Sequence, residues 1–389
     1  MKVAIDGGCL ANRRGFGRFT RELLGALAEI DADHEYVLVL DRPSADSVEV
    51  PERFRVVVVD VARAPSQAAS ARGQRSALDL WRMGRVVARE TPDLIFFPAT
   101  YSYFPVWNCR KTIVTLHDTL ALERPELVFP TKAGRWAWTL KERAAVLQAD
   151  RVLTVSEASK RALMAYFHLP ETSVGVISEA PQAVFQPTRA GMESDRALRR
   201  HGIEPGRRFF LYVGGLAPHK NLPRLVDAFA RLERTDISLV IVGDHADVFH
   251  SELAVIRERI KDRRLVGRVL LPGFVPDEDL VFLYGRAMSL VQPSLLEGFG
   301  LPPLEAMACG TPVVCSRAGS LPEVVGAAGL YFEPTSVDDI SAALRRFLDF
   351  DRDFLAQVAL ERARRFTWER AARRLLDEFA RPFRPVKVA

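Results

Sequence analysis

Residues 289–325 read SLVQPSLLEGFGLPPLEAMACGTPVVCSRAGSLPEVV. The apolar run at the start predicts a buried strand over 289–292, and a turn with two glycines follows it. The two prolines of the LPPLE segment suit the first turn of a helix, where a missing amide hydrogen costs nothing. Gly310 is expected to end that helix, and 312–316 has the composition of a second buried strand. Strand, turn, helix and strand in this order predict an α/β fold.

Two carboxylates bracket the turn, at Glu297 and Glu305. Glu297 follows a predicted strand end, and Glu305 lies in the first turns of the helix. The amides of Phe299, Gly300 and Leu301 approach the helix N-terminus, a position that favours anions such as phosphate. A ligand with sugar hydroxyls on both sides of a phosphate group would satisfy all these groups. The alternative is a surface loop with two solvated glutamates.

The segment GFGLPPLEAMACGTPVVCS, with SLPEVV after it, strongly resembles the Glu-x7-Glu signature of retaining GT-B glycosyltransferases of family 4. Within that family it is most similar to bacterial mannosyltransferase B-like enzymes. The resemblance implies that Glu305 accepts hydrogen bonds from ribose hydroxyls and that Glu297 contacts the donor sugar. It also implies that the amides of 299–301 meet sugar hydroxyls and phosphate. It covers nearly the whole chain and is weakest over 41–91.

Length and composition set the limits of the search. The chain has 389 residues, long enough for two domains, with 48% hydrophobic and 26% charged residues as in soluble globular proteins. A net charge of +5 is too mild for a dedicated nucleic-acid binder and is compatible with anionic substrates or membranes. The four cysteines lack metal-ligand spacing. MKVAIDGG predicts a strand rather than a signal peptide, and no apolar run approaches the roughly 20 residues that span a bilayer. We expect a cytoplasmic protein, or one peripheral to the inner membrane face.

The first loop is rich in glycine and arginine. It reads RRGFGR over 13–18, between a short strand and a helical pattern over 20–30. Gly15 and Gly17 let the backbone approach a ligand or take a positive φ. The loop does not match GxGxxG, but it resembles the first loop of the family. That implies a place beside the donor phosphates and the acceptor, with Arg18 as a candidate phosphate or acceptor contact. The alternative is an ordinary surface turn.

A basic helix is predicted in the first half of the chain. The segment 63–74 is rich in Ala, Ser, Gln and Arg and predicts a mobile loop, and a helical pattern follows over 75–90. One face of this helix carries four arginines, at Arg75, Arg82, Arg85 and Arg89. Such a helix is either solvated or faces the headgroups of an anionic membrane.

One histidine stands at a predicted strand end. A buried strand over 93–99 leads into an aromatic loop over 100–107, and the next strand, over 113–116, delivers His117 and Asp118 to the same edge. In doubly wound sheets ligands bind at this edge. A lone histidine is usually structural, but this position favours function. The family has a matching histidine here, which implies that His117 touches the donor sugar.

Alternating strands and helices occur twice along the chain. This predicts two Rossmann-like βαβ domains facing across a cleft, which is the GT-B architecture. We place an N-terminal, acceptor-side domain at 1–185 and a C-terminal, nucleotide-sugar-binding domain at 207–367. A linker over 181–207 contains a short helix near Leu198. The resemblance implies that a last helix, over 368–383, packs back on the N-terminal domain.

Lys220 is the expected phosphate ligand, because it follows a strand and a glycine-rich loop and precedes a helix. Many family members have an arginine where Gly215 stands and a basic residue where His219 stands. Lys220 is therefore expected to act with backbone amides, or with Arg18 or His219. The chain lacks a DxD-like cluster and the family works without metal, so no metal or other cofactor is expected. The segment around Phe274 is expected to border the base.

These features predict a retaining, metal-independent hexosyltransferase with His117, Lys220 and Glu297 as catalytic residues. The family retains configuration by front-face attack assisted by the leaving phosphate, and the sequence shows no obvious covalent nucleophile. The favoured donor is GDP-mannose, and the acceptor is a saccharide or a lipid-linked saccharide in polysaccharide or glycoconjugate assembly. The alternatives are a nucleotide-sugar 2-epimerase on the same architecture and a non-catalytic sugar-nucleotide-binding protein.

Overall fold

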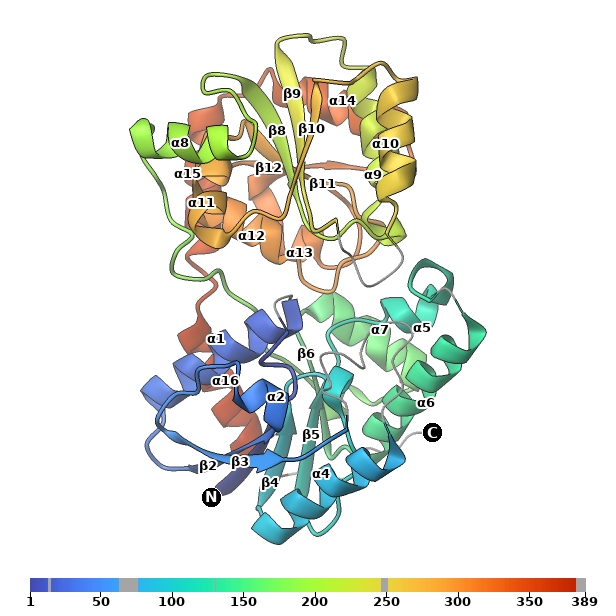
Figure 1. The fold of residues 1–389 in the computed structure, drawn as a ribbon, viewed down its shortest axis with the longest axis vertical. Helices are drawn as coiled ribbons and strands as arrows, with labels where there is room; N and C mark the ends of the chain where they lie inside the picture. Colours follow the sequence, from blue (N-terminus) through green and yellow to red (C-terminus); the bar gives the residue numbers. More distant parts are fainter. Residues whose placement is uncertain (13–14, 63–75, 130, 246–250, 383–389) are drawn as a thin grey trace. The chain divides into compact units, whose positions relative to one another are not determined.

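The computed structural model describes residues 1–12, 15–62, 76–129, 131–245 and 251–382. Contacts within the chain divide it into two units. The first comprises Met1–Glu179 together with the segment from Thr367 onward, and the second comprises Ala180–Phe366. Figure 1 shows that each unit is a sheet covered by helices. Each therefore has a core of its own.

The first unit is built on a seven-stranded sheet, with the order β3-β2-β1-β4-β5-β6-β7 and parallel pairing throughout. The strands are β1 (Lys2–Asp6), β2 (Glu35–Asp41), β3 (Phe54–Val59), β4 (Leu94–Phe97), β5 (Lys111–Thr115), β6 (Arg151–Thr154) and β7 (Val174–Val176). The chain moves outward from β1 to β3 and then returns to the other side of β1. Ligands of such sheets bind at this reversal, beyond the carboxyl ends of the strands.

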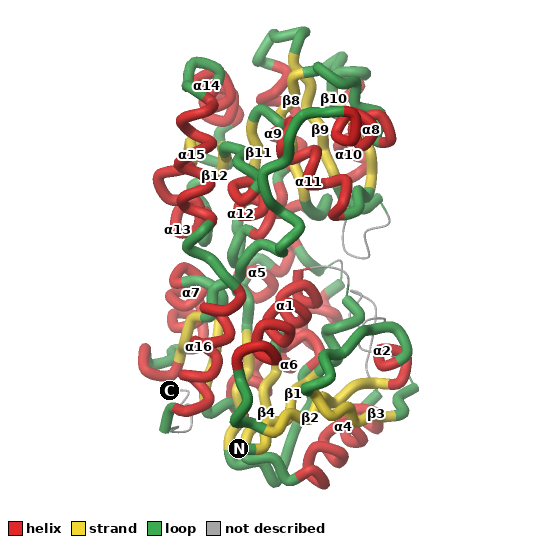
Figure 2. Tube along the Cα trace, turned by 90° about the vertical axis from the view of Figure 1, so that its left-hand side faces the viewer, coloured by secondary structure: helices red, strands yellow, loops and turns green. Residues whose placement is uncertain are grey.

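Helices cover both faces of this sheet, as its continuously apolar strands require. One face carries α1 (Gly15–Ile30) and α16 (Trp368–Ala380), which pack against each other. The other face carries α4 (Ala77–Glu90), α6 (Lys132–Gln148) and α7 (Glu157–Phe167), which share one apolar core with β4, β5 and β6 (Figure 2). Two short helices, α2 (Arg42–Ala45) and α5 (Leu120–Glu123), complete the unit.

The second unit repeats the plan with six parallel strands in the order β10-β9-β8-β11-β12-β13. The strands are β8 (Arg208–Val213), β9 (Ile237–Val242), β10 (Val269–Gly273), β11 (Ser289–Gln292), β12 (Val313–Ser316) and β13 (Gly329–Phe332). The main core lies under α9 (Leu222–Ala230), α10 (Leu253–Asp262) and α14 (Val337–Phe347). The remaining helices are α8 (Met192–Arg200), α11 (Asp277–Arg286), α12 (Leu301–Ala308), α13 (Leu321–Val325) and α15 (Arg352–Ala363). Here the strand order reverses between β8 and β11.

The segment expected as a linker is partly built into the second unit. Its helix, α8, packs against α11 through buried Ala197 and Leu198. Arg286 Nη1 of α11 also donates to Asp195 Oδ1 of α8 at 2.9 Å, so a polar contact joins the two helices in addition to the apolar one. The lack of strand periodicity over 181–207 therefore reflects a packed helix and its flanks rather than a free connection. Among the described residues, no helix combines the length and apolar character needed to cross a membrane.

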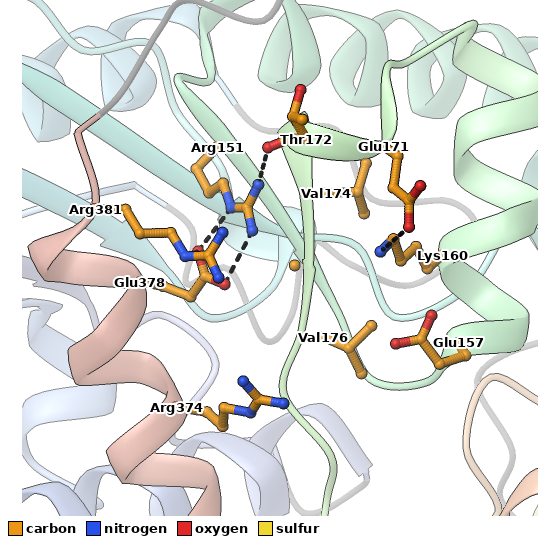
Figure 3. A pocket seen from close by; sticks show the side chains of 11 residues that line it. Arg151, Glu157, Lys160, Glu171, Thr172, Val174, Val176, Arg374, Glu378 and Arg381 are labelled. Carbon is orange, nitrogen blue, oxygen red and sulfur yellow. Dashed lines mark hydrogen bonds and ion pairs between the residues drawn. The ribbon is translucent and has the colours of Figure 1, made fainter.

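A buried ion pair holds α16 to the first sheet. Arg151 Nε lies 2.7 Å from Glu378 Oε2, and both side chains are buried. A Cβ atom on Gly175 would lie 2.6 Å from Glu378 Oε1, so glycine makes room for the pair. The pair forms one wall of a pocket of about 340 Å³ along β7, between α7 and α16 (Figure 3). Of the last predicted helix, Phe383 lies outside the described residues.

Candidate functional site

The second unit places Lys220 against Glu297. Lys220 ends a 3₁₀ turn after β8, and Glu297 lies in the loop after β11. Since β8 and β11 are neighbours at the reversal of strand order, their carboxyl ends meet where ligands bind. Lys220 Nζ lies 2.7 Å from Glu297 Oε1. Two of the three residues assigned to catalysis are thus in direct contact.

The Glu297 carboxyl is held in its ionised form. Burial is the largest single influence and opposes ionisation, but the charge and hydrogen bond of Lys220, together with the hydrogen bond of Ser294, lower the pKa of Glu297. Gln292 Nε2 and Ser294 Oγ also donate to Oε1, at 2.7 and 2.6 Å. Neither partner was predicted from the sequence, although they lie five and three residues before Glu297. Polar residues inside and just after an otherwise apolar strand were the available signal.

Hydrogen bonds fasten the two loops that carry this pair. Asn221, which is buried and next to Lys220, donates through Nδ2 to the carbonyl oxygens of Pro293 and Pro334, at 3.0 and 2.8 Å. The Ser320 hydroxyl donates to the Glu297 carbonyl at 3.1 Å. A Cβ atom on Gly319, whose φ is +57°, would lie 2.3 Å from that carbonyl oxygen. The ion pair therefore sits on a preorganised backbone.

The His219 side chain is a neutral imidazole rather than a cation in this structure. Burial and the adjacent charge of Lys220 lower the pKa of His219 to about 3. Its Nδ1 atom is buried without a hydrogen-bond partner among the described residues. His219 therefore cannot supply the positive charge missing at Gly215 near neutral pH. Gly215 contributes its backbone, and its carbonyl accepts a 2.6 Å hydrogen bond from the Tyr212 hydroxyl.

The glycine turn leads into α12 as predicted from its prolines. Gly300 has φ of +108° and precedes the first helical residue, Leu301. The Phe299 and Leu301 side chains are buried, and Phe299 packs on Phe366 with 5.8 Å between ring centroids. These two side chains are therefore not available to a ligand, and the role predicted for the amides of 299–301 stays a prediction. Of α12's own side chains, Glu305 is buried too, and its Oε2 accepts a 3.0 Å hydrogen bond from the Tyr284 hydroxyl.

Phe274 is the exposed aromatic of this region. It directly follows β10, and its side chain is largely in solvent. A strand end is the position from which an aromatic ring can stack on a flat ligand group. The predicted place of Phe274 beside a base is compatible with this exposure, and it stays a prediction.

In the first unit, His117 lies beyond the carboxyl end of β5. Its ring is buried and makes T-shaped contacts with Phe16 and Phe19, each with 4.8 Å between ring centroids. Nε2 lies 3.0 Å from the Pro98 carbonyl oxygen, and Nδ1 lies 3.3 Å from Glu179 Oε1. Both nitrogens therefore have partners already. A sugar contact would compete with one of these bonds, and the role of His117 stays a prediction.

The first loop differs from its predicted form. Helix α1 begins at Gly15, so Gly15, Gly17 and Arg18 all lie in the helix rather than in a loop before it. Neither glycine has a positive φ. A Cβ atom on Gly17 would lie 1.7 Å from the Asn12 carbonyl oxygen, so Gly17 serves close packing of the chain on itself. The prediction of a loop over this segment was wrong for 15–18, while Arg13 and Arg14 lie outside the described residues.

A buried carboxyl in the first unit escaped sequence analysis. Glu142 on α6 has Oε1 3.5 Å from Thr100 Oγ1, in the aromatic loop after β4. Its Oε2 is buried without a hydrogen-bond partner in the described part of the chain. Burial raises the pKa of Glu142 to about 7, against the opposing charge of Lys141. Its spacing from Ala145 and Val146 on the buried face of α6 could have revealed it.

The structure describes three of the four arginines that were predicted to share one face of a helix. Arg75 lies outside the described residues, and α4 begins at Ala77. Arg82 lies 3.6 Å from buried Asp79, and the Arg85 guanidinium lies 4.9 Å from the centre of the Trp81 ring. The described arginines are exposed.

Comparison with known proteins matches both halves of the chain. Residues 13–180 match the family described as Glycosyltransferase Family 4, and residues 193–365 match Glycosyl transferases group 1. The chain is 32% identical over 296 residues to O-antigen chain mannosyltransferase B of Escherichia coli, which covers 75% of each protein. It is 26% identical over 394 residues to serotype-specific mannosyltransferase WbdA of Escherichia coli, of which it spans 46%.

Solved structures show the same fold. Sucrose-phosphate synthase from Thermosynechococcus elongatus superposes with a TM-score of 0.74 at 21% identity, covering 97% of this chain and 98% of that one. HepE from Anabaena, in complex with UDP and glucose, gives a TM-score of 0.73 at 18% identity, covering 98% and 100%. Each of these two structures thus covers almost the whole chain.

Proposed function

The chain belongs to the group 1 and family 4 glycosyltransferases of GT-B fold, and from that membership we propose that it transfers mannose from GDP-mannose to a saccharide or lipid-linked acceptor. The transfer retains anomeric configuration and needs no divalent ion. The relatives named O-antigen chain mannosyltransferase B and mannosyltransferase WbdA support the sugar. The acceptor belongs to polysaccharide or glycoconjugate assembly.

The observation that carries this proposal is the Lys220–Glu297 contact at the reversal of strand order. Transfer from a nucleotide sugar must stabilise a leaving diphosphate, and a fixed cation aimed at it accomplishes that. In this structure Glu297 is the counter-ion of Lys220, at 2.7 Å. A bound diphosphate would compete for Lys220, and Glu297 would then be available to the hydroxyls of the donor sugar.

The remaining residues take roles around this pair. The amides of Phe299, Gly300 and Leu301 belong to the N-terminal end of α12, where backbone donors and the helix dipole favour phosphate. Glu305 accepts from the ribose hydroxyls. His219, being neutral, donates or accepts a hydrogen bond instead of supplying charge. His117 of the first unit contacts the sugar, and Phe274 borders the base.

The test is a product analysis with purified protein. The protein is incubated with GDP-mannose, and in parallel with UDP-sugars, together with membrane-derived lipid-linked saccharides. We expect a mannosylated product from GDP-mannose alone, and nuclear magnetic resonance should report the same anomeric configuration as in the donor. Isomerised donor without acceptor would point to an epimerase, and an inverted product would contradict the retaining mechanism.

Peripheral binding to an anionic membrane is part of the proposal. A lipid-linked acceptor resides in the membrane, so an enzyme that docks there meets its substrate in two dimensions. The basic face of α4 supports such docking, and its described arginines, Arg82, Arg85 and Arg89, are exposed.

A further inference from the structure

The outward side of α6 exposes large apolar side chains. Trp136, Leu140 and Leu147 are 73%, 70% and 67% exposed. With Lys132 and Arg143 they recur every three or four residues, so all five fall within an arc of about 80° on a helix of 3.6 residues per turn. We call these five residues the outer face of α6. Large apolar groups gathered in this way mark a binding surface.

The opposite side of the same helix already supplies the core. Ala145 and Val146 are fully buried against the sheet, and Glu142 is buried beside them. The orientation of α6 is therefore set by its inner side, and the apolar residues outside contribute nothing to that packing. Trp136, Leu140 and Leu147 therefore form a second apolar stripe on α6, which faces away from the core.

The charge on this surface has one sign. α6 is described throughout and carries a single carboxylate, Glu142, which is buried. Lys132, Arg135 and Arg143 are exposed and form no ion pair within the described part of the chain. The apolar stripe is thus flanked by unneutralised cations, and a second copy of the same face would offer them no anion.

The surface continues onto α4 through the segment after β4. The Tyr103 hydroxyl donates to Gln148 Oε1 at the end of α6, at 2.7 Å. A Cβ atom on Gly84 of α4 would lie 2.6 Å from the Trp107 ring, so that ring lies on α4. Trp107 is 39% exposed and Trp81, on α4, is 45% exposed. Of the five tryptophans in the chain, three are thus exposed on this side of the first unit.

We propose that the outer face of α6 docks on an anionic lipid bilayer, with Trp107 and α4 at its margin. Tryptophan prefers the depth of the headgroups, leucine side chains reach the acyl boundary, and lysine and arginine pair with anionic headgroups. All three requirements are met by residues on one arc of one helix. This inference rests on the membrane association proposed above and moves its centre from α4 to α6.

Vesicle co-sedimentation of the full chain tests the proposal. The probes are vesicles of phosphatidylcholine with and without phosphatidylglycerol, at low and at high salt. Wild type should bind the anionic vesicles, and high salt should weaken that binding. Combining Trp136→Ser, Leu140→Ser and Leu147→Ser should lower the partition coefficient at least about tenfold. The matched control combines Met192→Ser, Val266→Ser and Phe354→Ser, which alter equally exposed apolar residues of the second unit and should leave binding unchanged.

Other arms separate the alternatives. Arg82→Ser with Arg85→Ser should reduce binding less than the α6 triple variant does. The proposal is overturned if wild type ignores anionic vesicles, if the α6 triple variant binds like wild type, or if only the α4 variant loses binding. It is also overturned if the triple variant merely converts an oligomer into a monomer. Binding of GDP, measured by calorimetry on the same proteins, reports separately on the proposed glycosyl transfer and should not differ between them.

Discussion

At the residue scale, Lys220 combines position and charge in a way that His219 and Gly215 do not. Lys220→Ala removes the cation facing the leaving diphosphate, so we expect turnover to fall at least about 10²-fold. Lys160→Ala is the matched control, because Lys160 pairs with Glu171 at 3.3 Å on α7 and should matter little. Steady-state transfer assays with circular dichroism measure both. Retention of more than about a tenth of the rate would move the phosphate role elsewhere.

Glu305 makes a second residue-scale prediction. Glu305→Ala removes the charged acceptor proposed for the ribose, so GDP should bind about 1.5–3 kcal/mol more weakly, as for hydrogen bonds to charged groups. Tyr284→Phe keeps the carboxylate and removes only its 3.0 Å partner, so its effect should be smaller. Calorimetric titration compares the three proteins. Unchanged affinity in the alanine variant would falsify the ribose assignment.

Glu142 predicts a pH dependence of stability. Its pKa is about 7 in the folded chain and near 4.5 when unfolded, so the folded state holds the extra proton between these values. The stability contribution of Glu142 therefore falls as pH rises from about 4.5 to 7 and stays low above that. Glu142→Gln should leave stability unchanged near pH 4 and raise it by up to about 3 kcal/mol at pH 8. Denaturant unfolding at both pH values checks this, and an equal difference at each would contradict it.

At the element scale, α16 depends on one buried ion pair. Glu378→Ala leaves Arg151 buried without its charge partner and should cost about 3–5 kcal/mol in the free energy of unfolding. Glu369→Ala removes an exposed pair with Arg373 on the same helix and should cost less than about 1 kcal/mol. Thermal and denaturant unfolding compare the two. Similar losses would mean that apolar packing, rather than the pair, holds α16.

Elements also show what sequence patterns could and could not predict. The turn before α12 was predictable because its prolines and Gly310 mark the helix ends. The start of α1 was not, because Gly15 and Gly17 are typical of a loop although they lie in the first helical turn. Glycine is needed at 17 because of its close contact with the Asn12 carbonyl oxygen. Contacts between distant segments, such as His117 with Glu179, leave no local pattern. Sequence therefore located the strand ends and their residues, while the partners of those residues needed coordinates.

At the scale of the whole molecule, the proposed function assigns the charge that stabilises the leaving diphosphate to Lys220 of the chain itself, without a divalent ion. Among the described residues, no group of three or more His, Cys, Asp or Glu side chains is placed to hold a metal ion. With Lys220 in that role, we expect transfer to continue undiminished in excess EDTA. A rate measurement with and without the chelator decides it. Abolition by EDTA with recovery on adding Mg²⁺ or Mn²⁺ would reassign the phosphate site.

The order of the two units along the chain has a consequence for biosynthesis. The first sheet is covered on one face by α16, which leaves the ribosome only after all of Ala180–Phe366 has been made. Until then Phe96 and the Arg151 guanidinium lack Phe379 and Glu378 as partners. Domains usually complete their folding in the order of synthesis. Here we expect the reverse, with the later-made unit completing its folding first. Until α16 has been made, the sheet of the first unit stays partly uncovered and accessible to chaperones.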